Sequence, residues 1–277
     1  MSSEAIKVGA VIYDPKVTVI WGIIADFFRR EGLETQCEFY SDYKSQVDGL
    51  FAGEIDVAWN SPLAWADCHL RGEGRCLYGA MRDTDRDRKT YILARKNGGP
   101  TSLAELKGKT VGLGASDSPQ ARLIPINLLR RHGLEFGRDY VEKRFDVGVG
   151  LHGDHVGGEL DAVKALQAGE VDAAAALDLN VEAWRKDGTL DANQIAVIAA
   201  TPEFDHCIFV GRPDLQPERF ERWMEVLNRM DYKNPDHKTM MDMEGLKAWV
   251  PGRTSGFAQL QEACDYLKFF GASAGKS

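Results

Sequence analysis

Short apolar runs alternate with helical patterns along most of the chain. Residues 6–12 are predicted as a buried strand, and residues 17–30 as a helix whose apolar side chains recur at helical spacing: Val17, Ile20, Trp21, Ile24 and Phe28. Residues 110–113 and 121–132 repeat the strand and helix order. Such alternation is typical of parallel sheets with helical crossovers, so we expect an α/β protein.

The end of the chain has a different pattern. Residues 217–230 and 256–270 are predicted as amphipathic helices with no strand between them. Helices of this kind suit packing against a sheet that has already formed.

A nine-residue pattern occurs twice. Residues 50–58 (LFAGEIDVA) and 166–174 (LQAGEVDAA) match at seven of nine positions when isoleucine and valine are taken as equivalent. Each copy follows a predicted helix, and its glycine, Gly53 or Gly169, suits the left-handed residue that ends a helix. Joints of this kind are common, so chance similarity is the alternative. We favour an internal duplication.

Composition argues against several classes of protein. The formal net charge of −8 disfavours a nucleic-acid-binding surface, which needs a basic stripe. The sequence has no run of about 18 apolar residues, so no membrane insertion is expected. A P-loop, a GxGxxG fingerprint and a Ser-His-Asp set are not recognisable, and we expect no cofactor.

The compartment is predicted from the N-terminus and the cysteines. The first residues, MSSEAIK, lack the basic and apolar regions of a signal peptide. The five cysteines are odd in number and contain no CxxC pair, which fits reduced thiols better than a disulfide framework. We therefore expect a cytoplasmic protein, or a periplasmic one if a leader has been removed.

The order and spacing of several segments resemble type II periplasmic binding proteins. These segments are residues 50–62 (LFAGEIDVAWNSP), residues 103–110 (LAELKGKT), the second repeat and residues 209–215 (FVGRPDL). The chain is most similar to the phosphate-, phosphite- and phosphonate-binding components of ABC importers, from about residue 6 to about residue 270. The resemblance implies two α/β lobes, each a mainly parallel sheet flanked by helices, with a ligand cleft between them.

The resemblance also implies two crossings between the lobes. We place them near residues 91–94 and 207–210, so that lobe 1 comprises residues 1–92 and 208–277, and lobe 2 comprises residues 93–207. One repeat copy then falls in each lobe, as a duplication requires.

Candidate ligand residues in lobe 1 follow predicted strands, where ligands of open α/β sheets bind. Tyr13 could stack on or hydrogen-bond a ligand; the alternative is a turn in which Asp14 caps the next helix. Asn60 and Ser61 follow the first repeat. Ser61 before Pro62 is a strong helix start, and this cap could contact a ligand or be purely structural.

Residues 116–120 are the segment that we expect to match Ser61 in lobe 2. They offer three polar side chains, Ser116, Ser118 and Gln120. The resembled phosphonate binders usually carry small hydroxyl residues and glycine here, whereas this chain inserts Asp117 and Pro119. A carboxylate would repel a bound phosphonate. Either Asp117 turns away as a cap, or the ligand carries a positive group.

Residues 151–159 (LHGDHVGGE) place two histidines in a glycine-rich turn. His152, His155 and Glu159 could hold a metal, or the histidines could act as general acids and bases. The H-x-x-H spacing is not that of a helical zinc motif. We therefore favour a ligand-binding loop with His155 as a contact, expect no metal, and keep His152 and His155 as the catalytic candidates if the chain is an enzyme.

Three further features complete the candidate site. Tyr91 lies at the first predicted crossing, and Asp178 ends the second-repeat strand. The run RDTDRDRK at residues 82–89 is expected to be a solvated loop of alternating charge. One of its arginines clamping an anion is the alternative.

Two functional classes remain open. The first is a binding protein that delivers a small polar or anionic solute, of the phosphonate or phosphate-like class, to an ABC-importer permease. The second is a cytosolic enzyme, because the same fold occurs in lyases of the decarboxylase and desulfinase types. The overall resemblance favours the binding protein, and the N-terminus and thiols favour the enzyme. A fold alone does not settle function, and we favour binding.

We predict that thiol titration of the denatured chain, without reductant, finds all five cysteines reactive. A result of three or one reactive thiols would mean disulfides and would indicate an oxidising compartment.

Overall fold

The chain folds into two units, of which a computed structural model describes residues 5–271. Unit 1 contains the residues up to Arg86 together with Asp205–Gly256, and unit 2 contains Asp87–Phe204 together with the residues from Phe257 onward. The chain thus passes between the units after Arg86, after Phe204 and after Gly256. These boundaries differ from the expected 92/93 and 207/208, and the third passage was not anticipated.

Unit 1 is built on one mixed sheet with strand order β2-β1-β3-β11-β4. Its strands are β1 (Ile6–Val11), β2 (Thr35–Tyr40), β3 (Val57–Asn60), β4 (Leu77–Tyr78) and β11 (Ile208–Gly211). A small second sheet pairs β5 (Ala80–Arg82) with β12 (Trp249–Pro251). The helices are α1 (Lys16–Arg30), α2 (Tyr43–Ala52), α3 (Pro62–Arg71), α7 (Pro217–Leu227) and α8 (Pro235–Glu244), with a 3₁₀ turn at Asp83–Asp85. Strand β12 lies in the stretch between the two late helices, where no strand was expected.

Unit 2 has one sheet with strand order β10-β6-β9-β7-β8. Its strands are β6 (Thr90–Arg95), β7 (Thr110–Leu113), β8 (Val141–Arg144), β9 (Ala173–Leu177) and β10 (Ile195–Ala200). A 3₁₀ turn (Ala104–Leu106) precedes β7, and a π-helical turn (Pro119–Leu123) leads into α4 (Ile124–Arg131). The other helices are α5 (Gly157–Gln167), α6 (Asp178–Asp187) and α9 (Ala258–Leu267).

The two sheets have the same pairing pattern. In unit 1, β1 runs parallel to β2 and β3, and β11 runs antiparallel to β3 and β4. In unit 2, β7 runs parallel to β8 and β9, and β6 runs antiparallel to β9 and β10. Strand β7 therefore corresponds to β1, and β9 to β3. This correspondence is what a duplication predicts.

The two repeat copies form equivalent joints between helix and strand. Gly53 follows α2 with φ of 74°, and Gly169 follows α5 with φ of 79°. A left-handed residue at this place ends a helix, and glycine adopts it without the penalty that a Cβ brings. One copy precedes β3 in unit 1 and the other precedes β9 in unit 2. The prediction of one copy in each half is confirmed.

The aspartates of the two repeat copies also make equivalent hydrogen bonds. The amide of Asp56 donates to the Lys7 carbonyl at 2.8 Å, and its carboxylate accepts from the Lys7 amide at 3.0 Å. Asp172 makes the same two bonds with Thr110, at 2.8 and 2.9 Å. Each aspartate thereby fastens the first residues of the central parallel strand pair in its unit.

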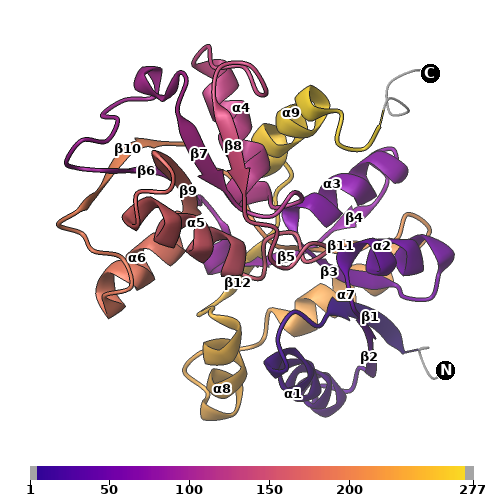
Figure 1. Cartoon of the computed structure of the whole chain (residues 1–277). Helices are drawn as coiled ribbons and strands as arrows, with labels where there is room; N and C mark the ends of the chain where they lie inside the picture. The colour runs from indigo at the N-terminus through magenta and orange to yellow at the C-terminus, as the bar shows by residue number, and fades with distance from the viewer. Residues whose placement is uncertain (1–4, 272–277) are drawn as a thin grey trace. The chain divides into compact units, whose positions relative to one another are not determined.

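The C-terminal helix α9 belongs to unit 2 because it packs along α4 (Figure 1). The hydroxyl of Tyr266 donates to Glu135 at 2.7 Å and accepts from the amide of Phe136 at 3.2 Å. Glu262 accepts from Asn127 on α4 at 3.2 Å. These bonds place α9 with unit 2, whereas we had expected it in lobe 1.

Two sequence expectations concern disulfide bonds and membrane-spanning helices. None of the five cysteines, all of which lie within residues 5–271, forms a disulfide. No helix in the part of the chain that the structure describes combines the length and apolar character needed to cross a bilayer.

We predict that Gly53→Ala and Gly169→Ala each lower the free energy of unfolding by about 1 kcal/mol, because a Cβ disfavours the left-handed conformation. Both positions have open space around a Cβ, so the loss is conformational rather than a clash. Gly22→Ala within α1 is the control: it also meets no neighbour, and it should stabilise by about 0.5–1 kcal/mol. Urea unfolding measures all three. Equal behaviour of Gly53→Ala and Gly22→Ala would contradict the account of the joint.

Candidate functional site

The candidate residues of unit 1 lie after neighbouring strands. Tyr13 follows β1 and Ser61 follows β3, and because β1 and β3 are parallel neighbours, both residues lie at the same edge of the sheet. Tyr13 is half-buried against the core. Ser61 caps α3, its Oγ accepting from the Ala64 amide at 3.2 Å. The predicted helix start at Pro62 is confirmed.

Asn60 is fully buried in a polar network of unit 1. Its Oδ1 accepts from Gln46 Nε2 at 2.8 Å, and its Nδ2 donates to Cys68 Sγ at 3.3 Å. Both ends of the amide are therefore engaged within the unit. This arrangement favours a structural role for Asn60 beside Ser61.

In unit 2 the structure brings Ser118 and Gln120 together with the glycine-rich loop. Ser118 caps the helical segment that begins at Pro119, accepting from the Ala121 amide at 3.1 Å. A Cβ on Gly153 would lie 2.6 Å from Ser118 Oγ and 2.4 Å from Gln120 Nε2, so only glycine allows this close approach. Because β7 corresponds to β1, this segment matches residues after β1, and the expected match to Ser61 was wrong. The counterpart of Ser61 lies after β9, at Asp178.

Glu159 organises this part of unit 2 from inside. It is 2% exposed and accepts from three donors: Gln120 Nε2 at 3.0 Å, the Leu177 amide at 2.8 Å and Asn180 Nδ2 at 3.0 Å. Burial raises its pKa, and the three hydrogen bonds oppose that rise. Gln120 Nε2 also donates to the Gly153 carbonyl at 2.8 Å. Glu159 thus fixes the Gln120 amide and, through it, the loop.

Asp117 turns onto the same loop. Its Oδ2 accepts from the Gly150 amide at 2.6 Å, and burial raises its pKa. Of the two alternatives left open by the sequence, the structure supports a carboxylate that binds backbone rather than one reserved for a cationic ligand.

The two histidines do not converge with Glu159. His155 is exposed at the loop surface, where its Nδ1 accepts from the Gly157 amide at 3.1 Å. His152 is half-buried, with a positive φ of 49°. Among the described residues, the metal-type ligand group found in the structure consists of Asp85, His206 and Cys207 instead. Glu159 instead accepts from interior donors, so the structure does not bring it together with the two histidines.

The other candidates of unit 2 lie at strand ends or on a strand. Asp178 begins α6, and Arg88 Nη1 lies 3.6 Å from its carboxylate. Tyr91 is half-buried on β6 against the core. Ser116 is half-buried, and its amide donates to Asp146 Oδ1 at 2.8 Å.

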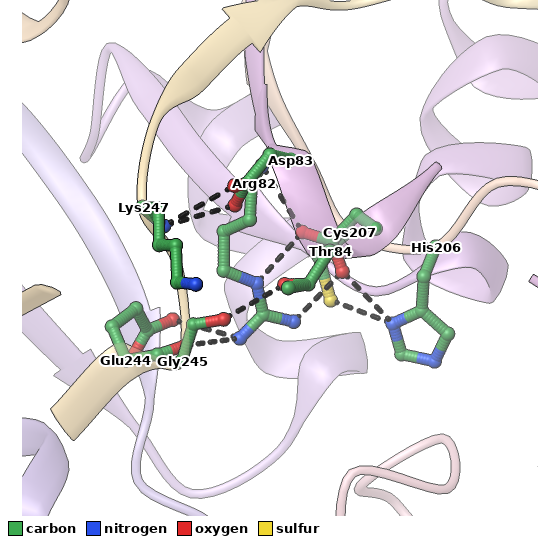
Figure 2. Close-up of polar contacts among 9 residues, drawn as sticks. Arg82, Asp83, Thr84, His206, Cys207, Glu244, Gly245 and Lys247 are labelled. Carbon is green, nitrogen blue, oxygen red and sulfur yellow. Dashed lines mark hydrogen bonds and ion pairs between the residues drawn. The ribbon is translucent and has the colours of Figure 1, made fainter. Parts of the chain in front are cut away.

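The charged run at residues 82–89 is not a solvated loop throughout. Arg82 Nη1 donates to Glu244 Oε1 at 3.2 Å (Figure 2). Arg82 Nε donates to Asp85 Oδ2 at 2.7 Å. Asp85 is 2% exposed. The expectation was wrong here because the 3₁₀ turn brings the charges of Arg82 and Asp85 together, which allows Asp85 to be buried beside the half-buried Arg82.

Comparison with known proteins decides the family. The sequence model described as "ABC transporter, phosphonate, periplasmic substrate-binding protein" matches residues 12–257. The chain belongs to this phosphonate-binding family.

Two relatives agree with the assignment. A probable ABC transporter phosphite binding protein, PhnD1 of Prochlorococcus marinus, is 26% identical over 235 residues, which cover 80% of this chain and 74% of PhnD1. The phosphate-import protein PhnD of Mycolicibacterium smegmatis is 23% identical over 215 residues, which cover 76% of this chain and 64% of the relative.

The structure of PhnD1 in complex with methylphosphonate superposes with a TM-score of 0.71 at 20% identity, covering 95% of this chain and 98% of PhnD1. This likeness confirms the fold class, a two-lobed α/β periplasmic binding protein. Membership of the phosphonate-binding family implies a small-molecule ligand and a transporter partner.

Glu159 was expected only as a possible metal ligand, and its structural role was not predicted from the sequence. The available signal was its position in the first turn of a helix that follows a glycine-rich loop. An acidic residue there is favoured by the helix dipole and can reach backbone donors of neighbouring segments.

We predict that Glu159→Gln is destabilising by about 1–3 kcal/mol at acidic pH, because an amide cannot accept from all three donors. A raised pKa means that the folded chain holds the Glu159 proton more tightly than the unfolded chain does. The stability from that proton is complete below the unfolded-state pKa and is lost as pH rises through the folded-state pKa. The deficit of the variant should therefore shrink as pH rises.

Glu105→Gln is the control for this pH dependence. Hydrogen bonds from Thr101 lower the pKa of exposed Glu105. The ionised Glu105 carboxylate contributes its full stabilisation above the unfolded-state pKa. The loss in free energy of unfolding caused by Glu105→Gln should therefore grow as pH rises. Urea unfolding at several pH values measures both trends, and parallel trends would refute the role given to Glu159.

Proposed function

We propose that the chain binds a small anion of the phosphonate or phosphate class and delivers it to an ABC-importer permease. The match of the phosphonate-binding family over residues 12–257 carries this proposal. The complex of PhnD1 with methylphosphonate shows that a protein of the same fold holds such an anion. Family membership also favours the periplasm as the compartment.

Three of the proposed contacts of unit 2 offer hydrogen-bond donors to an anion. Ser118 Oγ accepts a backbone bond and keeps its own proton for a ligand. His155 Nδ1 accepts from Gly157, so in the neutral ring Nε2 carries the proton and can donate outward. The Ser116 hydroxyl is a third donor group, two residues before the Ser118 cap, near the start of the helical segment, where anions are favoured.

We propose that Tyr13 and Ser61 supply the contacts from unit 1. The candidate set in unit 2 is completed by Gln120, Tyr91 and Asp178. In unit 1, the buried Asn60 stabilises the segment that carries Ser61. The meeting of both sets on one ligand stays a prediction.

The lyase alternative is weaker after the comparisons, because the matched family and its relatives are described as transport proteins. It makes a distinct demand on His152 and His155. A lyase needs one of them as a general acid or base, whereas a binding protein needs only their hydrogen bonds.

We predict that methylphosphonate, phosphite or phosphate raises the melting temperature of the chain. The free energy of unfolding should increase by about 2.7 kcal/mol when the ligand is at a hundredfold excess over Kd. Ser118→Ala and Ser61→Ala should weaken affinity about five- to tenfold, because each removes one hydrogen bond worth about 1 kcal/mol. Isothermal titration calorimetry gives the affinities, and phosphorus NMR of the incubated mixture shows whether the ligand is recovered.

Both serines are helix caps, so their loss also destabilises the fold by about 1 kcal/mol. Asn234→Ala is the matched control: Asn234 caps α8 by accepting from the Asp236 amide at 3.0 Å. It should lower stability without changing affinity. Conversion of the ligand, abolished by His152→Ala or His155→Ala, would establish the lyase alternative instead. Unchanged affinity in both serine variants would disprove the proposed contacts.

A further inference from the structure

A second polar cluster lies inside unit 1, next to the candidate residues Asn60 and Ser61, because Asn60 pairs with Ile208 on the antiparallel strand β11. It combines Asp85 at the end of the 3₁₀ turn with His206 and Cys207, which lead into β11. The three side chains come from residues that are 2%, 7% and 2% exposed, respectively. Figure 2 shows the imidazole of His206 directed at the sulfur of Cys207.

The ligand atoms of the cluster converge on one point. His206 Nδ1 lies 3.1 Å from Cys207 Sγ and 3.7 Å from Asp85 Oδ1, and all three atoms lie within 4.8 Å of one another. A Cys-His-Asp relay would need the thiol and the carboxylate on opposite ring nitrogens. Here both face Nδ1. The geometry therefore does not suit nucleophilic catalysis, and it does suit a shared cation.

The charged residues around the cluster are compatible with a bound cation. Arg82 donates to both oxygens of Asp85, at 2.7 and 2.8 Å, and also to Glu244. Asp85 Oδ2 also accepts from the Arg82 amide at 3.2 Å, so Oδ1, the oxygen 3.7 Å from His206 Nδ1, is the one with a second lone pair for the cation. Arg82 thus orients Asp85 as outer partners orient metal ligands. One guanidinium, two carboxylates, one thiolate and a divalent cation are together neutral, which a buried cluster requires.

We propose that Asp85, His206 and Cys207 form a binding site for one zinc ion. Thiolate, imidazole and carboxylate are all zinc ligands, and the sulfur disfavours magnesium and calcium. With Zn–S of about 2.3 Å and Zn–N of about 2.0 Å, tetrahedral coordination separates sulfur and nitrogen by about 3.5 Å. The His206 ring must therefore move by only a few tenths of an ångström. The fourth position is left for water.

The site joins two of the segments by which the chain leaves and re-enters unit 1. Asp85 lies just before the passage after Arg86, and His206 lies just after the passage that follows Phe204. The two segments already meet through the bond from the His206 amide to the Asp85 carbonyl at 2.7 Å. A zinc ion would add a side-chain link to this backbone link and would stabilise unit 1.

The test uses the full chain, stripped of metal with a chelator and titrated with Zn²⁺ and with Co²⁺. We expect one ion per chain, a rise in melting temperature, and a Co²⁺ spectrum with a thiolate-to-metal charge-transfer band. Cys207→Ser and His206→Asn should each weaken Zn²⁺ affinity by more than about a hundredfold, the upper range for losing even an outer partner. Cys37→Ser and His132→Asn, which change a thiol and an imidazole elsewhere, should bind as the parent does.

Cys207→Ser preserves the shape of the side chain, and circular dichroism of the metal-free variant checks that it folds. The parent chain alone also decides the proposal. Failure to bind a stoichiometric ion, or a Co²⁺ complex without the thiolate band, would overturn it. Equal weakening in Cys37→Ser and Cys207→Ser would show adventitious thiol binding and would overturn it too.

Discussion

The carboxylate of one aspartate in each half of the chain holds the central strands in register. The parallel pairing of β1 with β3 is short, with Val8 opposite Val57 and Gly9 opposite Ala58, and the Asp56 carboxylate extends it by one side-chain bond. An arginine from the adjacent antiparallel strand region meets the aspartate in both units: Arg212 lies 3.1 Å from Asp56, and Arg95 lies 4.0 Å from Asp172. The residues that follow these strands, where the candidate ligand contacts lie, depend on that register.

The repeat predicted more of the fold than any single element did. Its glycine and aspartate are needed by local backbone geometry, so they are visible in the sequence wherever that geometry recurs. The passages between units could not be placed as well, because strands β6 and β11 enter their sheets from distant parts of the chain. Nothing local distinguishes a helix such as α9 that packs on α4 from one that packs on the other unit.

The candidate site was predicted by position and only partly by role. Ser118 and Ser61 cap helices as their sequence indicates, because Ser-Pro is a local signal. Hydrogen-bond partners that lie far apart in sequence could not be predicted. Gln46 donates to Asn60, and Gln120 and Leu177 donate to Glu159. The ion pair of half-buried Arg82 and buried Asp85 could not be predicted either, since alternating charges have the same sequence pattern in a solvated loop and in a turn that pairs them.

The assignment of α9 to unit 2 has a consequence for the order of folding during synthesis. Unit 2 obtains all its strands once the ribosome has made Ala200, but the face of α4 stays uncovered until Ala258–Leu267 emerges. Unit 1 likewise waits for β11, which arrives about 150 residues after β3. Unit 1 is therefore completed only once Trp249–Pro251 has been made, and unit 2 only once Ala258–Leu267 has been made. Until then the nascent chain exposes apolar surface and unpaired strand edges, which are the features that chaperones recognise.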